Sequence, residues 1–219
     1  MSELLPHITL DTGLNPQYSI IWLHGLGANG EDFVPIVDEI HLPHEVRYIF
    51  PNAPKRRVTI NGGFIMPAWY DISTTNIGEQ PDAVGIRASQ LQVEKLIAHE
   101  MQRGIPASHI FLAGFSQGGA IALFTGLRFK QRLGGILALS TYLPLSDTLQ
   151  EEAQLDALST HIFMAHGLYD TVIPLASGKA SAEFLLKQGC ILEWYEYAMQ
   201  HTVCMEEIQA IEQWLTQRM

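Results

Sequence analysis

The chain has 219 residues, enough for one sizeable core, and 47% of them are hydrophobic, which excludes a disordered or fibrous protein. Thirteen Lys and Arg against 23 Asp and Glu give a formal net charge of −10, which opposes binding to nucleic acid or to anionic lipid headgroups. The sequence shows no recognisable signal peptide and no apolar run near the ~20 residues of a membrane span. We therefore expect a cytoplasmic protein with one domain over residues 1–219.

Short apolar runs alternate with longer amphipathic segments along the chain. The predicted strands are His7–Asp11, Ser19–Leu23, Val46–Phe50, Ile110–Ala113, Gly135–Leu139, His161–Ala165 and Leu192–Tyr197. The predicted helices are Asp82–Arg103, a segment after Ser116 that reaches Leu127, Ala176–Lys187 and Val203–Arg218. Several strands are apolar at consecutive positions, as in sheets covered on both faces. The alternation predicts a mainly parallel sheet between helices, with the functional site at the carboxyl ends of the strands.

The sequence GFSQG at 114–118 places Ser116 between two glycines, after a predicted strand and before a predicted helix. This G-x-S-x-G pattern in a strand–turn–helix context is typical of a nucleophilic serine held on a sharp turn. The glycines leave room for the close passage of strand and helix. The alternative is a Gly-Ser turn that only caps a helix.

A nucleophilic serine needs a base, and in this kind of fold the acid and then the histidine follow the serine in chain order. His166 and His201 both lie beyond Ser116 at predicted strand ends, but only His201 follows the best acid candidate, Asp170. Asp170 comes a few residues after a strand, whereas the other acidic candidates lie by a surface helix or within a strand: Asp147, Asp156, Glu193 and Glu196. We therefore predict Ser116, Asp170 and His201 as a catalytic triad. A turn aspartate and a lone loop histidine are the alternatives.

Two backbone N–H groups are candidates for an oxyanion hole. One belongs to Gln117, directly after the nucleophile, and the other to Leu26 in the Gly-rich segment WLHGLGANG at 22–30. A phosphate-binding loop is the alternative for this segment, but the acidic residue expected at the following strand end is missing. His24 has no place in the serine–acid–histidine order, so we expect a structural role for it.

Five segments together resemble the small carboxylesterase and acyl-protein thioesterase family of α/β-hydrolases. They are WLHGLGANG, FPNAPKRRVTINGGFIMPAWYD, GFSQGGA, HGLYDTVIP and MQHTVCMEEI. The resemblance implies a compact α/β-hydrolase fold without a large lid domain, the same triad and oxyanion donors, no metal and no cofactor. It also implies that Met66–Asp71 borders an acyl-binding groove. Ala198 and Gln200 depart from the family, which often has smaller residues there, and this affects the expected substrate range.

An acyl chain needs an apolar trough. Apolar side chains in the segment 62–78, read as an irregular loop, and after two later strands are expected to form it: Phe64, Met66, Trp69, Leu143, Leu145 and Val172. Plain core packing is the alternative for these residues.

The sequence thus predicts a serine esterase that acts on acyl esters or thioesters, whether small molecules, lipids or acylated proteins. A hydrolase of polar or cyclic small esters and a non-catalytic binding protein on the same fold are the alternatives. Peripheral membrane contact and homodimer formation are left open by the sequence.

Overall fold

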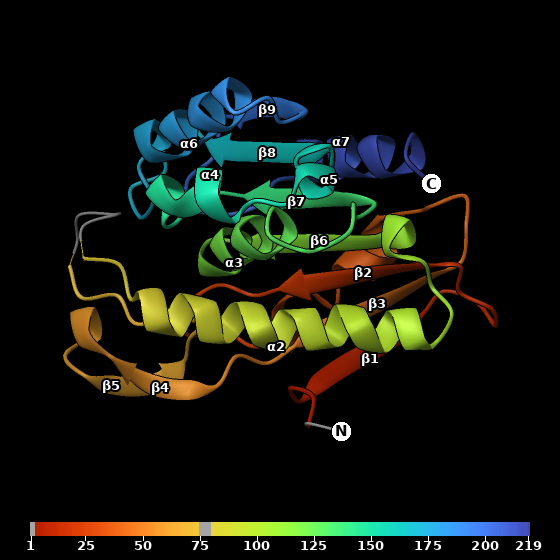
Figure 1. Ribbon diagram of the computed structural model, residues 1–219, viewed down its shortest axis with the longest axis horizontal. Helices are drawn as coiled ribbons and strands as arrows, with labels where there is room; N and C mark the ends of the chain where they lie inside the picture. The colour runs from red at the N-terminus through yellow and green to blue at the C-terminus, as the bar shows by residue number, and fades with distance from the viewer. Residues whose placement is uncertain (1–2, 75–79) are drawn as a thin grey trace.

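The protein is described by a computed structural model that covers residues 3–74 and 80–219. Its main sheet has seven strands in the order β1-β3-β2-β6-β7-β8-β9. Their bounds are β1 (His7–Asp11), β2 (Tyr18–Leu23), β3 (Val46–Pro51), β6 (Ile110–Phe115), β7 (Gly135–Leu139), β8 (Ile162–Gly167) and β9 (Leu192–Tyr197). The edge strand β1 is antiparallel to β3, and the other pairs are parallel. All seven predicted strands are present, and the mainly parallel sheet is confirmed (Figure 1).

Helices cover both faces of this sheet (Figure 1). The α-helices are α1 (Ile36–Glu39), α2 (Ala83–Gln102), α3 (Gln117–Gly126), α4 (Leu149–Glu152), α5 (Leu155–Leu158), α6 (Leu175–Lys187) and α7 (Met205–Thr216). Short 3-10 helices are η1 (Gly30–Phe33), η2 (Thr59–Asn61), η3 (Ala107–His109) and η4 (Ser146–Thr148). Buried residues of α2, α3 and α6 share one hydrophobic cluster, and those of α1 and α7 share the other. No helix in the described ranges is long and apolar enough to cross a bilayer.

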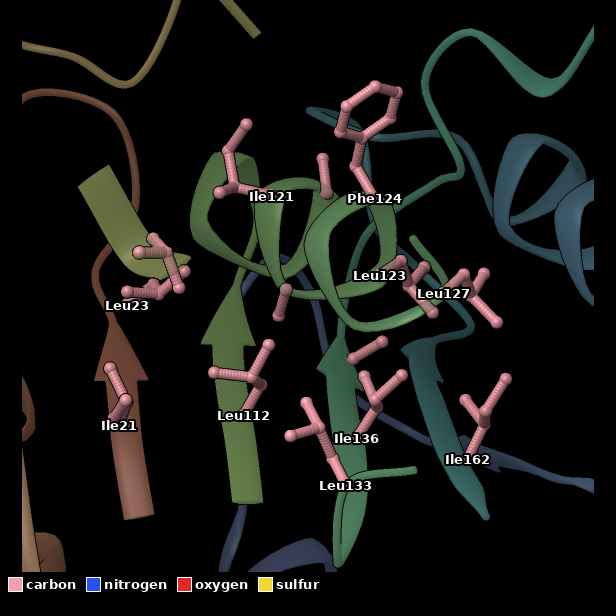
Figure 2. Close-up of a cluster of buried hydrophobic side chains, with 14 of the residues drawn as sticks. Ile21, Leu23, Leu112, Ile121, Leu123, Phe124, Leu127, Leu133, Ile136 and Ile162 are labelled. Carbon is pink, nitrogen blue, oxygen red and sulfur yellow. The ribbon is translucent and has the colours of Figure 1, made fainter. Parts of the chain in front are cut away.

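The strands alternate their side chains between these two clusters. On β6, Ile110 and Leu112 join the cluster under α2 and α3, whereas Phe111 and Ala113 join the one under α7. Both sets are fully buried, which explains why the strands are apolar at consecutive positions. Figure 2 shows strand side chains such as Leu112 directed toward α3. All ten residues of α3 are buried, so the helix that follows Ser116 is fixed inside the protein.

The segment 62–78 is not the irregular loop predicted from the sequence. Lys55–Val58 (β4) and Phe64–Pro67 (β5) pair as an antiparallel hairpin, and the part at 75–78 lies outside the described residues. Gly62 and Gly63 have φ of 67° and 77°, a conformation that glycine adopts without strain, and they supply the turn. The Gly27 N–H donates to Pro67 O at 2.9 Å and ties the hairpin to the loop that contains Leu26.

Candidate active site

Ser116 occupies a strained turn between β6 and α3. Its φ is 55° and its ψ is −122°, which is unfavourable for a residue with a Cβ and is often kept at functional sites. The neighbouring segment after β7 holds the turn: the Ser116 N–H donates to Leu139 O at 2.9 Å, and Thr141 Oγ1 donates to Ser116 O at 2.7 Å. Fully buried neighbours therefore impose this backbone on Ser116.

The two glycines of the motif are required by close backbone contacts. A Cβ on Gly114 would lie 2.4 Å from the carbonyl of Gly118, and a Cβ on Gly118 would lie 2.2 Å from Leu23 O. No side chain fits at such distances without moving β2 or α3. The helix therefore starts directly against the end of β2, where the Leu26 loop begins.

The three residues of the predicted triad form one chain of hydrogen bonds. His201 Nε2 lies 2.9 Å from Ser116 Oγ, and His201 Nδ1 lies 2.7 Å from Asp170 Oδ2. Because a carboxylate only accepts, Nδ1 carries the hydrogen, which leaves Nε2 free to accept the serine proton. The Asp170 side chain is fully buried, whereas the His201 side chain is 16% exposed. The ring of Phe115 packs against His201 with its centroid at 4.6 Å.

The loops that hold the acid and the histidine are joined to each other. Tyr169 N–H donates to Met199 O at 3.0 Å, and Leu168 N–H donates to Tyr197 O at 2.8 Å. Gly167 lies so close to the second loop that a Cβ there would be 2.3 Å from Gln200 O. These contacts fix the separation of Asp170 and His201 through the backbone.

The two predicted oxyanion donors are free. Neither the Leu26 N–H nor the Gln117 N–H donates to an acceptor within the described part of the chain. The side chain of Gln117 is occupied elsewhere, since its Oε1 accepts from Trp69 N–H and its Nε2 donates to Tyr70 O, both at 2.8 Å. Free N–H groups beside a nucleophile at a helix N-terminus are suited to bind a developing negative charge.

His24 has the structural position that its sequence context suggested. The ring is 1% exposed, Nδ1 donates to Gly25 O at 2.7 Å, and Nε2 accepts from Ala53 N–H at 3.0 Å. Burial lowers the pKa of His24, so the ring stays neutral and joins the Leu26 loop to the segment after β3.

A cavity of about 460 Å³ opens beside the serine. Ser116 and His201 lie in its wall, together with Leu26. Most of the other lining side chains are apolar, and one is a carboxylate: Phe33, Phe115, Val172, Val203 and Asp32. The size and lining suit a small to medium acyl group next to the nucleophile.

Only one of the six residues predicted to bind substrate lies in the wall of this cavity, and it is Val172. Trp69 was predicted wrongly, because its ring is fully buried and its Nε1 donates to His24 O at 2.8 Å. Leu143 is 5% exposed and packs in the core. Leu145 is partly buried against the same core.

Phe64 and Met66 lie on β5, outside the cavity wall. Phe64 is 73% exposed, and Met66 Sδ lies near Gly27, where an added Cβ would be 3.6 Å from it. Gln200, whose departure from the family was expected to affect the substrate range, is exposed and does not line the cavity.

Sequence reasoning missed most of the cavity wall. Phe115 and Val203 are within two residues of Ser116 and His201, so their closeness in sequence was a usable signal. Asp32 and Phe33 belong to η1, which follows the glycine loop, and no periodic pattern marks so short an element.

Comparison with known proteins decides the family. The model of the phospholipase/carboxylesterase family matches residues 9–219. The chain belongs to this family. It is 39% identical to acyl-protein thioesterase 1 of Neurospora crassa, over 92% of this chain and 86% of that one. It is 37% identical to acyl-protein thioesterase 1 of Yarrowia lipolytica, over 90% of both chains.

A solved structure agrees with this assignment. The crystal structure of Zea mays acyl-protein thioesterase 2 superposes with a TM-score of 0.86 at 28% identity, over 98% of this chain and 99% of that one. The α/β-hydrolase fold predicted for the family is therefore confirmed, and the described residues contain no large additional domain. The protein is an ester hydrolase by family.

Proposed function

We propose that the protein is a serine hydrolase that cleaves acyl esters and thioesters through an acyl-enzyme. The observation that carries the proposal is the continuous hydrogen-bonded chain from Asp170 through His201 to Ser116, at 2.7 and 2.9 Å. In it, His201 Nε2 takes the Ser116 proton while Oγ attacks the substrate carbonyl carbon. The negative charge on the carbonyl oxygen is bound by the N–H groups of Leu26 and Gln117.

The second half of the reaction reuses the same groups. Protonated His201 gives its proton to the leaving alcohol or thiol, and the acyl group stays on Ser116. Water then loses a proton to His201 and attacks the acyl-serine, which releases the carboxylic acid and restores the serine. Removing one oxyanion donor in such sites typically costs about 3 kcal/mol of barrier.

The acyl-protein thioesterase relatives and the apolar cavity wall support acyl groups as the substrate class. The test is a matched series of acetyl, butyryl and octanoyl oxygen esters and thioesters. We expect octanoyl esters to be cleaved at least as well as acetyl esters, and activity to vanish in Ser116→Ala. The control is Ser140→Ala, which alters another buried serine of positive φ at a strand end and is expected to keep the activity. A steep preference for acetate would favour the polar-ester alternative, and an active Ser116→Ala would reject the serine mechanism.

We further propose that the β4–β5 hairpin contacts an anionic membrane surface. Phe64 and Ile65 are 73% and 63% exposed, and they pair with a strand that contains Lys55, Arg56 and Arg57. Exposed apolar side chains next to basic ones suit a negatively charged lipid surface, although the whole chain is acidic.

The membrane proposal is tested by cosedimentation with vesicles. We expect binding to phosphatidylserine-containing vesicles, weaker binding to pure phosphatidylcholine, and loss of binding in the double variant Phe64→Ser, Ile65→Ser. Leu14→Ser removes an exposed leucine elsewhere and serves as the control, with binding unchanged. Equal binding by the double variant would contradict the proposal.

A homodimer, a single domain over 1–219 and a cytoplasmic location stay predictions. Sedimentation velocity, limited proteolysis and imaging of a fluorescent fusion would test them in turn.

A further inference from the structure

His166 lies at the end of β8, fully buried behind the acid of the triad. Its Nε2 is 2.8 Å from Ile173 O and 3.4 Å from Asp170 Oδ2. Both of these oxygens are acceptors, because one is a carbonyl and the other belongs to the carboxylate that binds His201. Nε2 of His166 must therefore carry a hydrogen, and this hydrogen faces both the Ile173 carbonyl and Asp170.

The other nitrogen of this ring, Nδ1, has no acceptor in the described part of the chain to which it could donate a hydrogen. His166 Nδ1 is buried and has no hydrogen-bond partner among the described residues. It packs against the backbone of α6, where a Cβ on Gly178 would lie 2.5 Å away, and Trp194 stacks on the ring at 6.0 Å. Burial lowers the pKa of His166, against the opposite influence of the Ile173 carbonyl and the Asp170 and Glu196 carboxylates. The ring is thus neutral, with its hydrogen on Nε2.

The turn from Asp170 to Ile173 is held from both ends. Asp170 Oδ1 accepts the N–H groups of Val172 at 2.8 Å and Ile173 at 2.9 Å. His166 Nε2–H donates to the carbonyl of Ile173, so both the N–H and the C=O of Ile173 are hydrogen-bonded. The orientation of the Asp170 carboxylate, and hence the direction of Oδ2 toward His201, depends on this closed arrangement.

We propose that His166 is a positioning residue of the triad, a neutral imidazole that fixes the Asp170 turn so that Oδ2 faces His201. The proposal rests on the serine-hydrolase function proposed above. Without the Nε2 hydrogen, the turn relaxes and the bond between Asp170 and His201 weakens. The imidazole of His201 is then held less firmly in the orientation and tautomer that accept the Ser116 proton, and acylation slows.

The test compares His166→Phe, which keeps a ring without a donor, with His166→Gln, whose amide nitrogen replaces Nε2. We expect His166→Phe to lower kcat/KM about 10- to 100-fold, by analogy with the loss found when the partner that orients a metal-binding side chain is removed. His166→Gln should recover most of the rate.

Two controls separate positioning from stability. His161→Phe changes a histidine just before β8 that makes no hydrogen bond to the triad, and it should leave the rate unchanged. A proton NMR spectrum of the free protein should show the downfield His201 Nδ1–H resonance in wild type and His166→Gln, and its loss or upfield shift in His166→Phe.

A folded His166→Phe with wild-type kcat/KM and a wild-type NMR resonance would overturn the proposal. If His166→Phe does not fold, His166→Asn replaces it, since its amide lies at the Nδ1 position; Gln and Asn variants of equal activity would likewise overturn it. If wild type itself shows no hydrolysis that depends on Ser116, the proposed function fails, whereas the NMR comparison still decides the role of His166.

Discussion

Gly118→Ala is expected to destabilise the protein and to remove its activity together. The new Cβ would lie 2.2 Å from Leu23 O, 2.5 Å from His24 O and 2.6 Å from Leu23 C, all backbone atoms that cannot rotate away. Lengthening the 2.2 Å contact to an ordinary one of 3.4 Å or more requires α3 and β2 to separate by about 1 Å, and the close-packed core has no free space to absorb this movement. Overpacking of this kind costs up to about 3 kcal/mol.

The assay for Gly118→Ala is thermal unfolding with kcat/KM measured on the same preparation. For a chain of this length, 3 kcal/mol corresponds to a fall in Tm of roughly 6–12 °C. Activity should fall further than stability predicts, because the same movement separates the N–H groups of Gln117 and Leu26.

A matched control lies on the same helix. At Gly126 an added Cβ would meet two atoms of the Ile136 side chain, Cδ1 at 2.5 Å and Cγ1 at 2.8 Å, but no backbone atom, and alanine favours helix by up to about 1 kcal/mol. A side chain shifts more readily than two backbone segments separate, so Gly126→Ala should be milder than Gly118→Ala and should keep its activity. A Gly118→Ala protein as stable and active as wild type would refute the reasoning from backbone contacts.

Three further predictions concern carboxyl groups. Asp170→Asn should fold normally but lower kcat by about 10⁴-fold, since the amide favours the wrong His201 tautomer; kinetics on a soluble ester would check it, and near-wild-type kcat would contradict it. Burial raises the pKa of Glu207 to about 8, and the nearby Cys204 N–H offsets this only in part, without forming a regular hydrogen bond to the carboxyl. The folded state therefore keeps a proton that the unfolded state loses from about pH 4.5 upward, so wild-type stability falls toward pH 8. Glu207→Gln should remove that fall, which amounts to a few kcal/mol at most, and urea unfolding of both proteins from pH 5 to 8.5 measures it. Stability curves of wild type and Glu207→Gln that stay parallel over this range would contradict the prediction. Asp32→Asn should raise kcat/KM for succinyl esters about 2- to 5-fold and leave neutral butyryl esters unchanged, because an exposed charge contributes up to about 1 kcal/mol; no selective gain would argue against Asp32 facing the substrate.

The parts of the fold that follow from local pattern could be predicted from the sequence. Strands that are buried along almost their whole length, such as β6 and β7, are apolar throughout. Helix α2 begins at the cap Asp82, whose side chain accepts from Gly85 N–H, and ends before Gly104 with φ of 100°. The β4–β5 hairpin lacks such a pattern, because β4 is mostly basic and β5, although apolar, is short and not buried. It is held by pairing and by the Gly27–Pro67 bond, which no local rule reveals.

In the candidate site, the triad could be predicted from the sequence, whereas most of the cavity wall could not. Ser116, Asp170 and His201 could be placed because each follows a strand in a parallel sheet, and the carboxyl ends of those strands lie at one edge. The cavity wall depends on which loop residues turn inward. Trp69 was expected in the groove, but its ring is fully buried and its Nε1 donates to the carbonyl of His24, 45 residues away in sequence. Hydrophobicity alone does not distinguish such a residue from a substrate-binding one.

The most direct measurement of the central claim is the site and rate of labelling by a fluorophosphonate, followed by intact mass and peptide mapping. The account predicts a single adduct on the Ser116 hydroxyl, formed roughly 10³-fold more slowly in His201→Ala. An adduct on any other residue, no adduct on the folded protein, or an unchanged rate without His201 would contradict it.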